Sequence, residues 1–359
     1  MNKYKICVYA ICKNEEKNIL SWVESMKEAD EIYVLDTGST DNSIKLLNDL
    51  GVKVKSLKID PWRFDEARNK SLELVPKDAD ICVCTDLDER FNKGWRKKLE
   101  EIWKDNQTRL GYLYNWSFNE YGLPATTFYI SKIHTRNNYK WINRVHEVLS
   151  CDIDEIEIKT DQIILNHYQD INKSRASYLP LLEQSVKDNP ENDRNMHYLG
   201  REYMYYKRWN ECIDTLIKHL NLKTATWKDE RCASMRYIAR CYIELERINE
   251  AIMWYKLAIN ESPYLREPYY ELGYLYYSNN MFLESKGYLI ECLKIKDKSK
   301  SYLNEYFCWN GSIYDILSIC EFNLGNTDEA IRYAELALKQ NPYEKRIKEN
   351  IKIMKSIKK

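Results

Sequence analysis

The stretch EIYVLDTGSTDNSIKLLNDL, residues 31–50, contains the change of hydrophobic period from which the fold can be predicted. Residues 31–35 form a short apolar run typical of a buried strand, and residues 41–50 place apolar side chains at helical spacing. Between them, Gly38 supplies the conformational freedom that a turn requires, and Thr40 or Asp41 is the expected N-cap of the helix. The stretch therefore predicts a strand, a polar turn and a helix in direct succession.

The same alternation extends in both directions along the first half of the chain. Further strand-like runs lie at residues 5–12, 52–57 and 79–85, and helical stretches lie at residues 15–26 and 64–74. Because such connections are short, right-handed crossovers, this order predicts a mostly parallel sheet with helices on both faces. Three later runs, at 111–118, 126–134 and 139–142, have no long helices between them and predict an antiparallel or mixed region. We therefore expect a Rossmann-like α/β domain over residues 1–168.

The second half of the chain, residues 169–359, is predicted to be an all-α domain of helical repeats. Its segments MHYLGREYMYY (196–206), MRYIARCYIEL (235–245) and YYELGYLYYSN (269–279) match one another, and a second helix follows each. A small residue of the second helices recurs at intervals of 39, 34 and 45 residues, at Cys212, Ala251, Ser285 and Ala330. A period of about 34 residues is typical of tetratricopeptide repeats, and lengthened connections are expected in the longer intervals. Such repeats could hold a peptide or another protein, or serve only as a scaffold or a homodimer contact.

The composition is that of a globular protein. Of 359 residues, 44% are apolar and 31% are charged, and no apolar run approaches the roughly 18 residues needed to cross a bilayer. Eleven cysteines without a CxxC pair favour buried thiols in a reducing cytoplasm over disulfides or a zinc site. Equal numbers of basic and acidic residues leave no basic field to hold nucleic acid. We therefore expect a cytoplasmic protein with no integral membrane segment and no nucleic-acid partner.

Three polar clusters follow the predicted strands, at the edge of the sheet where open α/β folds bind ligands. They are CKNEEKN (12–18), DTGSTDNS (36–43) and CTDLDERF (84–91). The third places Asp86, Asp88 and Glu89 within four positions. Like charges this close repel, so the segment is either a solvated turn or the site of a cation. Glu89 is expected either to support a metal shell through water or to pair with Arg90.

Together with FDEARNKSL (64–72), the three clusters resemble the GT-A fold of family 2 glycosyltransferases, over roughly residues 4–168. This resemblance implies a nucleotide-sugar donor, usually a UDP-sugar. It implies that Asp36 accepts a hydrogen bond from the base, that Asp86 reaches the ribose or the metal shell, and that Asp88 ligates Mg²⁺ or Mn²⁺. The other donor-binding residues that it implies are Ala10, Asn14, Glu15, Arg68 and Leu87. Arg68 would pair with donor phosphate or with Asp86; the alternative is an ion pair on the helix surface.

The same resemblance implies a catalytic base near the end of the first domain. In NRVHEVL (143–149), Glu147 is the expected base, and His146 and Arg144 are expected on the acceptor or donor side. Alternatively, Arg144 and Glu147 form an ion pair with each other. His167 would complete the metal or diphosphate site, or else simply pack beneath the helical domain. Three more histidines are expected to be structural: His134, His197 and His219.

A narrower resemblance comes from the RVHE-like motif, the HY motif that contains His167, and Lys173 and Arg175 before the helical repeats. This combination resembles a bacterial subgroup that includes sublancin-type transferases, which glycosylate cysteine or serine of bacteriocin peptides. It implies an inverting, metal-dependent hexosyltransferase (EC 2.4.1.-) that moves a glucose- or GlcNAc-type sugar from a UDP-sugar to a Cys or Ser side chain of a peptide or protein. Two alternatives stay open: a transferase that builds a cell-surface polysaccharide or lipid-linked saccharide, and a non-catalytic repeat protein that binds a partner.

Overall fold

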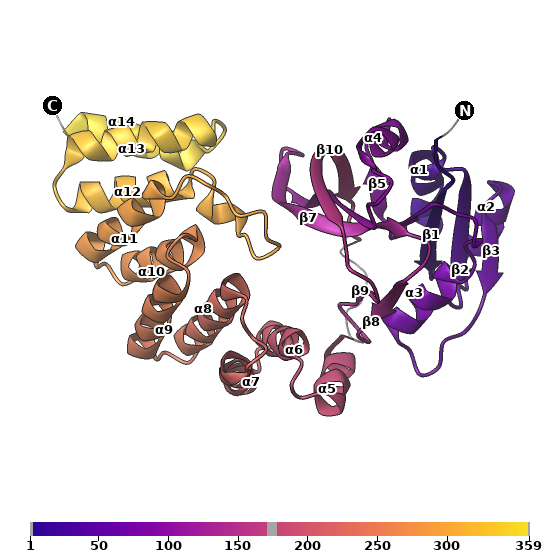
Figure 1. Cartoon of the computed structure of the whole chain (residues 1–359). Helices are drawn as coiled ribbons and strands as arrows, with labels where there is room; N and C mark the ends of the chain where they lie inside the picture. Colours follow the sequence, from indigo (N-terminus) through magenta and orange to yellow (C-terminus); the bar gives the residue numbers. More distant parts are fainter. Residues whose placement is uncertain (1–2, 171–177, 358–359) are drawn as a thin grey trace. The chain divides into compact units, whose positions relative to one another are not determined.

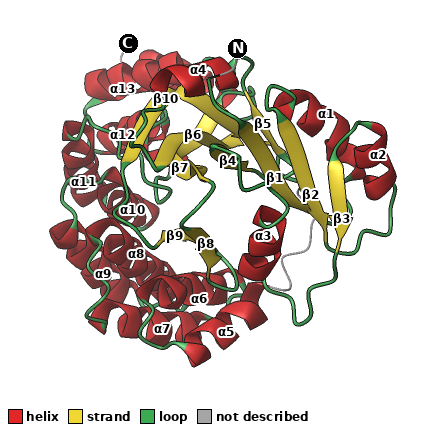
Figure 2. Ribbon diagram, turned by 45° about the vertical axis from the view of Figure 1, so that its right-hand side comes forward, coloured by secondary structure: helices red, strands yellow, loops and turns green. Residues whose placement is uncertain are grey.

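The computed structural model describes residues 3–170 and 178–357, which divide into two compact units. The first is Met1–Lys187 and the second is Asp188–Lys359. Among the described residues, strands occur only in the first unit, and the second consists of helices and connecting loops (Figure 2). No helix within the described ranges combines the length and the apolar character that a membrane crossing requires.

The first unit is built on an eight-stranded sheet in the order β3-β2-β1-β4-β7-β6-β10-β5 (Figure 1). Its strands are β1 (Ile6–Cys12), β2 (Glu31–Asp36), β3 (Lys53–Ser56), β4 (Ile81–Cys84), β5 (Glu89–Phe91), β6 (Arg109–Phe118), β7 (Pro124–Thr135) and β10 (Glu157–His167). The helices are α1 (Glu16–Met26), α2 (Ser43–Asp49), α3 (Phe64–Leu72), α4 (Trp95–Ile102) and α5 (Tyr178–Asp188). A separate hairpin pairs β8 (Tyr139–Ile142) with β9 (Val148–Cys151).

The strand directions confirm the predicted parallel core with a mixed region. Strand β1 pairs in parallel with both β2 and β4, and β2 pairs in parallel with β3. Strand β7 then runs antiparallel to β4 and β6, while β10 is parallel to β6 and antiparallel to β5. Three elements, α4, β5 and β9, were not predicted. Strand β5 has only three residues, and α4 has only eight, of which two are buried, so each offers a short stretch in which to recognise a period.

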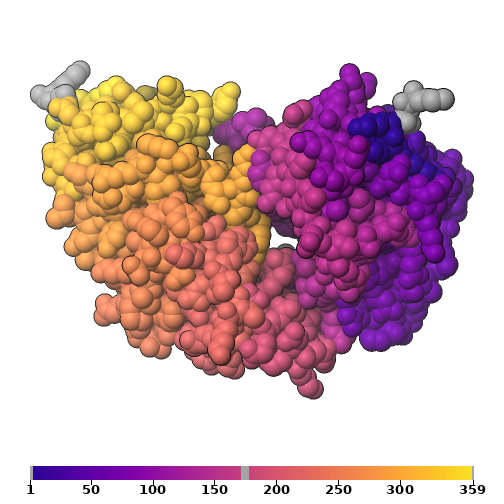
Figure 3. All heavy atoms as spheres, viewed as in Figure 1, coloured from indigo at the N-terminus to yellow at the C-terminus, as the bar shows by residue number. Residues whose placement is uncertain are grey.

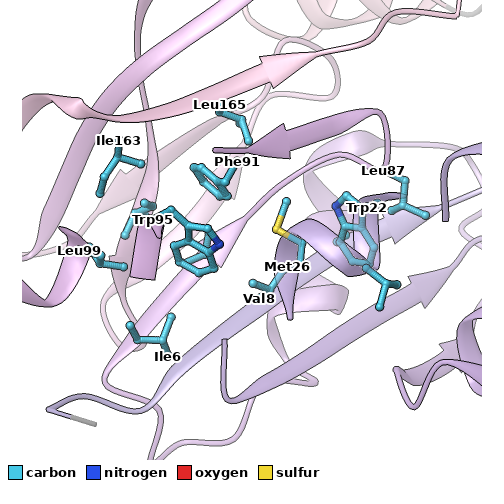
Figure 4. Packing of buried hydrophobic residues seen from close by; sticks show 14 of the residues in the cluster. Ile6, Val8, Trp22, Met26, Leu87, Phe91, Trp95, Leu99, Ile163 and Leu165 are labelled. Atoms are coloured by element: carbon cyan, nitrogen blue, oxygen red, sulfur yellow. The ribbon is translucent and has the colours of Figure 1, made fainter. Parts of the chain in front are cut away.

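Two apolar clusters lie on opposite faces of the sheet because side chains alternate along each strand. Ile6, Val8 and Ala10 of β1 face a cluster that includes residues of α1, α2 and α4. Figure 4 shows its members from α1, α4, β5 and β10 gathered beside β1. Cys7 and Tyr9 face a second cluster formed with the end of α3 and the β8–β9 hairpin. All eleven cysteines are free, as expected.

The second unit consists of antiparallel helix pairs with one further helix at the end. Its α-helices are α6 (Asp193–Tyr205), α7 (Trp209–Asn221), α8 (Lys228–Glu244), α9 (Ile248–Glu261), α10 (Arg266–Ser278), α11 (Phe282–Lys294), α12 (Ser312–Asn323), α13 (Thr327–Gln340) and α14 (Lys345–Ile357). Apolar clusters join successive helices along this unit, and Figure 3 shows its atoms closely packed from orange to yellow. This succession confirms the predicted repeat pattern.

The small positions of the second helices are the packing points of this stack. Cys212, Ala251, Ser285 and Ala330 are all fully buried. The longest interval contains the extended connection 295–311, as expected. The 39-residue interval is different, because part of its excess lies inside α8, which has 17 residues where α10 has 13. The expectation that a loop alone accounts for this interval is wrong.

Candidate functional site

The first two polar clusters interlock where β1 and β2 end. The Oδ1 atom of Asn14 accepts the Thr40 backbone N–H at 2.7 Å, and Ser39 Oγ accepts the Asn14 N–H at 2.8 Å. The Glu15 N–H donates to Ser43 Oγ at 2.8 Å. Strands β1 and β2 pair up to their last residues, so the loops that follow them emerge side by side. The loops that follow β1 and β2 are therefore held together by hydrogen bonds at this edge of the sheet.

Asp36 shapes the second of these loops. It is almost completely buried, and its Oδ2 accepts the backbone N–H groups of Gly38 at 3.0 Å and Ser39 at 3.2 Å. Gly38 has φ +108°, which confirms its expected role in the turn. The helix α2 begins at Ser43 rather than at residue 41, and its N-cap position is Asn42, so the predicted cap position at Thr40 or Asp41 lies one or two residues too early. Asp41 instead accepts the Ser43 N–H within the turn at 3.0 Å.

The acidic turn after β4 is held by a largely buried lysine. Lys132 of β7 places its Nζ 3.2 Å from Asp86 Oδ2 and 3.4 Å from Glu89 Oε1. Glu89, 1% exposed, also accepts the Asp86 N–H at 2.8 Å and the Tyr114 hydroxyl at 2.7 Å. Burial and the charges of Asp86 and Asp88 raise the pKa of Glu89, while Lys132 opposes them. The repulsion among these carboxylates is thus offset by a cation of the protein itself.

Glu89 does not pair with Arg90, so that alternative is wrong. The guanidinium of Arg90 donates instead to the backbone carbonyls of Leu87 at 2.6 Å and Asn18 at 2.9 Å. These bonds tie the acidic turn to α1. Neither Lys132 nor Tyr114 was predicted at the site. Neither residue carries a local signal of its role, because only the order of strands in the sheet shows that β6 and β7 face the acidic turn.

Arg68 of α3 joins the acidic turn to the predicted base. Its Nη2 lies 2.7 Å from Asp86 Oδ1 and its Nε lies 2.5 Å from Glu147 Oε1. Arg68 is 4% exposed, so this is a buried bridge and not the surface ion pair that was the alternative. Burial opposes ionisation of Asp86, but Arg68 and Lys132 outweigh it and hold the pKa of that carboxyl well below its usual range. Glu147 is thus paired with Arg68.

Asp88 and His167 meet because β5 pairs with β10. Glu89 and His167 are register partners, and the backbone carbonyl of Asp88 accepts the Tyr168 N–H at 2.8 Å. His167 Nε2 lies 3.5 Å from Asp88 Oδ2. Its Nδ1 lies 3.1 Å from the Trp116 carbonyl oxygen, which can only accept, so Nδ1 carries a proton. In the neutral ring, the lone pair of Nε2 therefore points toward the Asp88 carboxylate, and the two repel each other. A proton or a metal ion between Nε2 and Oδ2 removes this repulsion.

This pair fits a divalent cation by the chemistry of its donor atoms. A carboxylate oxygen and an imidazole nitrogen suit Mn²⁺ better than Mg²⁺, which prefers oxygen ligands alone. In the absence of a cation, burial lowers the pKa of His167, but the hydrogen bond and charge of Asp88 outweigh it and raise that pKa. A protonated His167 or a bound cation would each offset the charge of Asp88.

The remaining predicted residues surround these groups in different ways. The side chains of Ala10 and Leu87 are packed in the apolar core, so only their backbone atoms could contact a donor. His146 has φ +51° and its ring lies 5.6 Å from that of Tyr178, while the Arg144 carbonyl accepts the Phe64 N–H at 2.9 Å. Both contacts place the RVHE-like segment beside α3 and α5. Two further predicted residues, Lys173 and Arg175, lie outside the described residues.

Comparisons with known proteins agree with this division of the chain. Residues 7–151 match the family described as Glycosyl transferase family 2, and residues 238–264 and 311–344 match the Tetratricopeptide repeat. The chain is 25% identical over 268 residues to the SPbeta prophage-derived glycosyltransferase SunS of Bacillus subtilis (strain 168), which covers 71% of this chain and 62% of that protein. The chain therefore spans less than two thirds of that relative's length.

Two further similarities cover shorter parts. The lipopolysaccharide core biosynthesis glycosyltransferase LpsC of Rhizobium meliloti (strain 1021) is 32% identical over 103 residues, 28% of this chain and 37% of that protein. The crystal structure of MamA covers 49% of this chain and 96% of its own, at 20% identity and a TM-score of 0.39. That TM-score is too low to support an inference.

Proposed function

We propose that this protein transfers a hexose from a UDP-sugar to a Cys or Ser side chain of a peptide, because residues 7–151 match Glycosyl transferase family 2 and matches to tetratricopeptide repeats follow. The observation that carries the proposal is the group of charged side chains beyond β4. Asp86 and Asp88 lie there with His167, Lys132 and Arg68 in contact with them. The similarity to SunS supports a peptide acceptor.

Asp36, at the end of β2, is proposed to accept a hydrogen bond from the uracil base. The Asp88 and His167 pair would hold Mn²⁺ or Mg²⁺, which when bound neutralises charge on the diphosphate. Asp86 is a third exposed, so it can reach the donor while Arg68 and Lys132 fix its position. Each ligand group is therefore already oriented by the buried network beneath it.

Glu147 is the proposed base. The acceptor sulfur or oxygen would attack the anomeric carbon as its bond to the diphosphate oxygen breaks, and UDP would leave with the electron pair. The acceptor proton would pass to Glu147, and the configuration at the carbon would invert. Arg68 fixes the position of this carboxylate at 2.5 Å, so Arg68 is a positioning residue for both Glu147 and Asp86.

The first experiment measures release of UDP from UDP-glucose and UDP-GlcNAc with Mn²⁺, with and without a chelator. We expect turnover that the chelator removes and that Asp88→Asn lowers by at least about 100-fold, since charge neutralisation of this kind is worth several kcal/mol. Asp49→Asn, on the exposed side of α2, is the matched control and should keep full activity. Turnover that resists both the chelator and Asp88→Asn would refute the metal assignment.

The second experiment separates the two acceptor atoms. A cysteine thiol ionises near neutral pH and needs little help from a base, whereas a serine hydroxyl needs a base far more. With otherwise identical Cys and Ser peptides, Glu147→Gln should abolish transfer to Ser and only reduce transfer to Cys. Equal rates for wild type and variant on both peptides would exclude Glu147 as the base.

A saccharide acceptor is the second candidate, favoured by the similarity to LpsC. The two candidate functions differ in whether the helical repeats of the second unit bind the acceptor. If the acceptor is a peptide bound by the repeats, an unglycosylated peptide should compete with transfer. If saccharide acceptors are used instead, they should be modified at rates that the peptide does not affect.

A further inference from the structure

A second cluster of potential metal ligands lies inside the helical unit, among residues to which the proposed reaction assigns no role. It combines His197 of α6, His219 in the last turn of α7 and Glu230 in the first turn of α8. One ring nitrogen of each histidine and one oxygen of Glu230 all lie within 4.8 Å of one another. Both histidines are fully buried and Glu230 is 4% exposed. Three helices of two successive repeats therefore converge on one point.

Ser234 orients both imidazole rings. Its Oγ lies 2.8 Å from His197 Nδ1 and 3.0 Å from His219 Nδ1. Ser234 is one helical turn after Glu230, so both side chains are on the same face of α8. A hydroxyl oxygen can accept two hydrogen bonds, so both rings can carry their proton on Nδ1 at once. In that state each ring presents an unprotonated Nε2, which is the form that binds a metal.

The two Nε2 atoms are the ring nitrogens that do not contact Ser234. Each is shielded from solvent, and neither forms a hydrogen bond with any described residue. His219 Nε2 does lie 3.4 Å from Glu230 Oε1. Neighbouring ligand atoms of a tetrahedral zinc ion with bonds of about 2.0–2.1 Å are separated by about 3.4 Å. This edge of the site thus already has the spacing that zinc requires.

The other oxygen of Glu230 is also held. Tyr302, in the connection between α11 and α12, donates its hydroxyl hydrogen to Glu230 Oε2 at 3.0 Å. Metal-binding histidines and carboxylates in proteins are usually fixed by such outer hydrogen bonds. Here a serine supports both imidazoles and a tyrosine supports the carboxylate. This arrangement is more than a chance meeting of three polar side chains.

We propose that His197, His219 and Glu230 bind a zinc-type divalent transition-metal ion that joins the first two helical repeats. Two imidazoles and one carboxylate are a ligand set that suits zinc, with a water molecule in the fourth position. The near-complete burial of the ligands makes the site structural, because a substrate could not approach it. This proposal is independent of the glycosyl transfer assigned to the first unit.

The test uses the full-length chain carrying Asp88→Ala, which removes the proposed cation site of the first unit. After treatment with a chelator and removal of the chelator, the protein is titrated with Zn²⁺ alone. Bound metal is measured by mass spectrometry, and stability is measured by thermal unfolding. We expect one Zn²⁺ per chain, a higher Tm, and, with Co²⁺ in its place, the visible absorption of a tetrahedral ion.

Two variants and one control make the test specific. Glu230→Gln should abolish stoichiometric binding, and Ser234→Ala should weaken it by about 10–100-fold, as loss of an outer hydrogen bond does at known sites. His134→Gln should bind normally, because both ring nitrogens of this buried histidine already have partners, the Tyr9 hydroxyl at 2.8 Å and the Thr135 carbonyl at 2.7 Å. Far-UV circular dichroism checks that each variant is helical, and Ser234→Ala decides the matter if Glu230→Gln fails to fold.

The proposal is overturned if the chelated protein binds no Zn²⁺ and its Tm is unchanged. It is also overturned if Ser234→Ala and folded Glu230→Gln bind Zn²⁺ as tightly as the parent chain. In either case the cluster would be only a buried hydrogen-bonded network.

Discussion

Replacing Glu89 by glutamine should loosen the acidic turn after β4 without changing its shape. In the native structure Oε2 accepts the Asp86 N–H, and Oε1 accepts the Tyr114 hydroxyl hydrogen and lies 3.4 Å from Lys132 Nζ. A glutamine has one acceptor oxygen and one NH₂ group. Its best orientation turns the oxygen to the Asp86 N–H and the NH₂ to Tyr114. The buried ammonium of Lys132 then faces a second donor in place of an acceptor.

The magnitude follows from these contacts. Hydrogen bonds to a charged group contribute about 1.5–3 kcal/mol and neutral ones about 0.5–1.5 kcal/mol, and a mismatched buried donor costs about 1–3 kcal/mol. We therefore expect Glu89→Gln to destabilise the turn by about 1–3 kcal/mol. Local opening of the turn would become about 5 to 150 times more frequent. Tyr114→Phe, which removes one hydrogen bond and leaves Lys132 paired, should cost about 1 kcal/mol, or roughly fivefold.

Amide hydrogen exchange of peptides covering residues 84–91 measures this opening directly. The Asp86 amide, which donates to Glu89, is the reporter in both variants. Exchange in Glu89→Gln should be clearly faster than in Tyr114→Phe, while peptides from α6 to α14 stay unchanged. If Glu89→Gln exchanges no faster than Tyr114→Phe, the acceptor that Glu89 offers to Lys132 does not hold the turn and the reasoning is wrong.

Two further predictions concern the helical unit. Gly200→Ala should destabilise this unit by about 1–3 kcal/mol, because the added Cβ would lie 2.5 Å from Cγ of the fully buried Leu216. Gly287→Ala has open space around its added Cβ and should instead stabilise α11 by up to about 1 kcal/mol. Urea unfolding compares the two, and a loss of stability in both variants would contradict the packing argument. Burial opposes ionisation of Glu271, but Arg236 and Arg240 outweigh it and lower its pKa from 4.5 to about 2, which corresponds to a stabilisation of at most about 3 kcal/mol. The pKa of Glu271 is lower in the folded than in the unfolded protein, so this stabilisation is complete above about pH 5 and is lost as the pH falls toward 2. The difference in unfolding free energy between wild type and Glu271→Gln should therefore shrink over that range, and a difference that stays constant from pH 6 to pH 2 would refute the prediction.

Much of the fold could be predicted from the sequence because its signals are local. The alternation of strands and helices up to β4 depends on hydrophobic period and turn residues within a few positions of each element. The helix pairs of the second unit are predictable for the same reason. Elements with weak local signals were missed, such as β5, whose three residues form a strand only through their pairing with β10.

The candidate site likewise contains residues that the sequence predicted and residues that it could not predict. The sequence placed Asp36, Asp86 and Asp88 at the ends of parallel strands, because strand order and connection rules bring those ends to one edge of the sheet. It could not show that Lys132 neutralises the acidic turn, since that residue is 46 positions from Asp86 and carries no local signal. Nor could it show that Arg68 holds Glu147, 79 positions away.

The sequence by itself thus determined the two architectures, the edge of the sheet that carries the polar loops, and the family that those loops resemble. Only the tertiary structure decided which charges meet. A buried carboxylate needs a counter-charge or donors close by, but any part of the chain that folds against it can supply them. The same reason explains His197, His219 and Glu230, which three separate helices bring within 4.8 Å of one another.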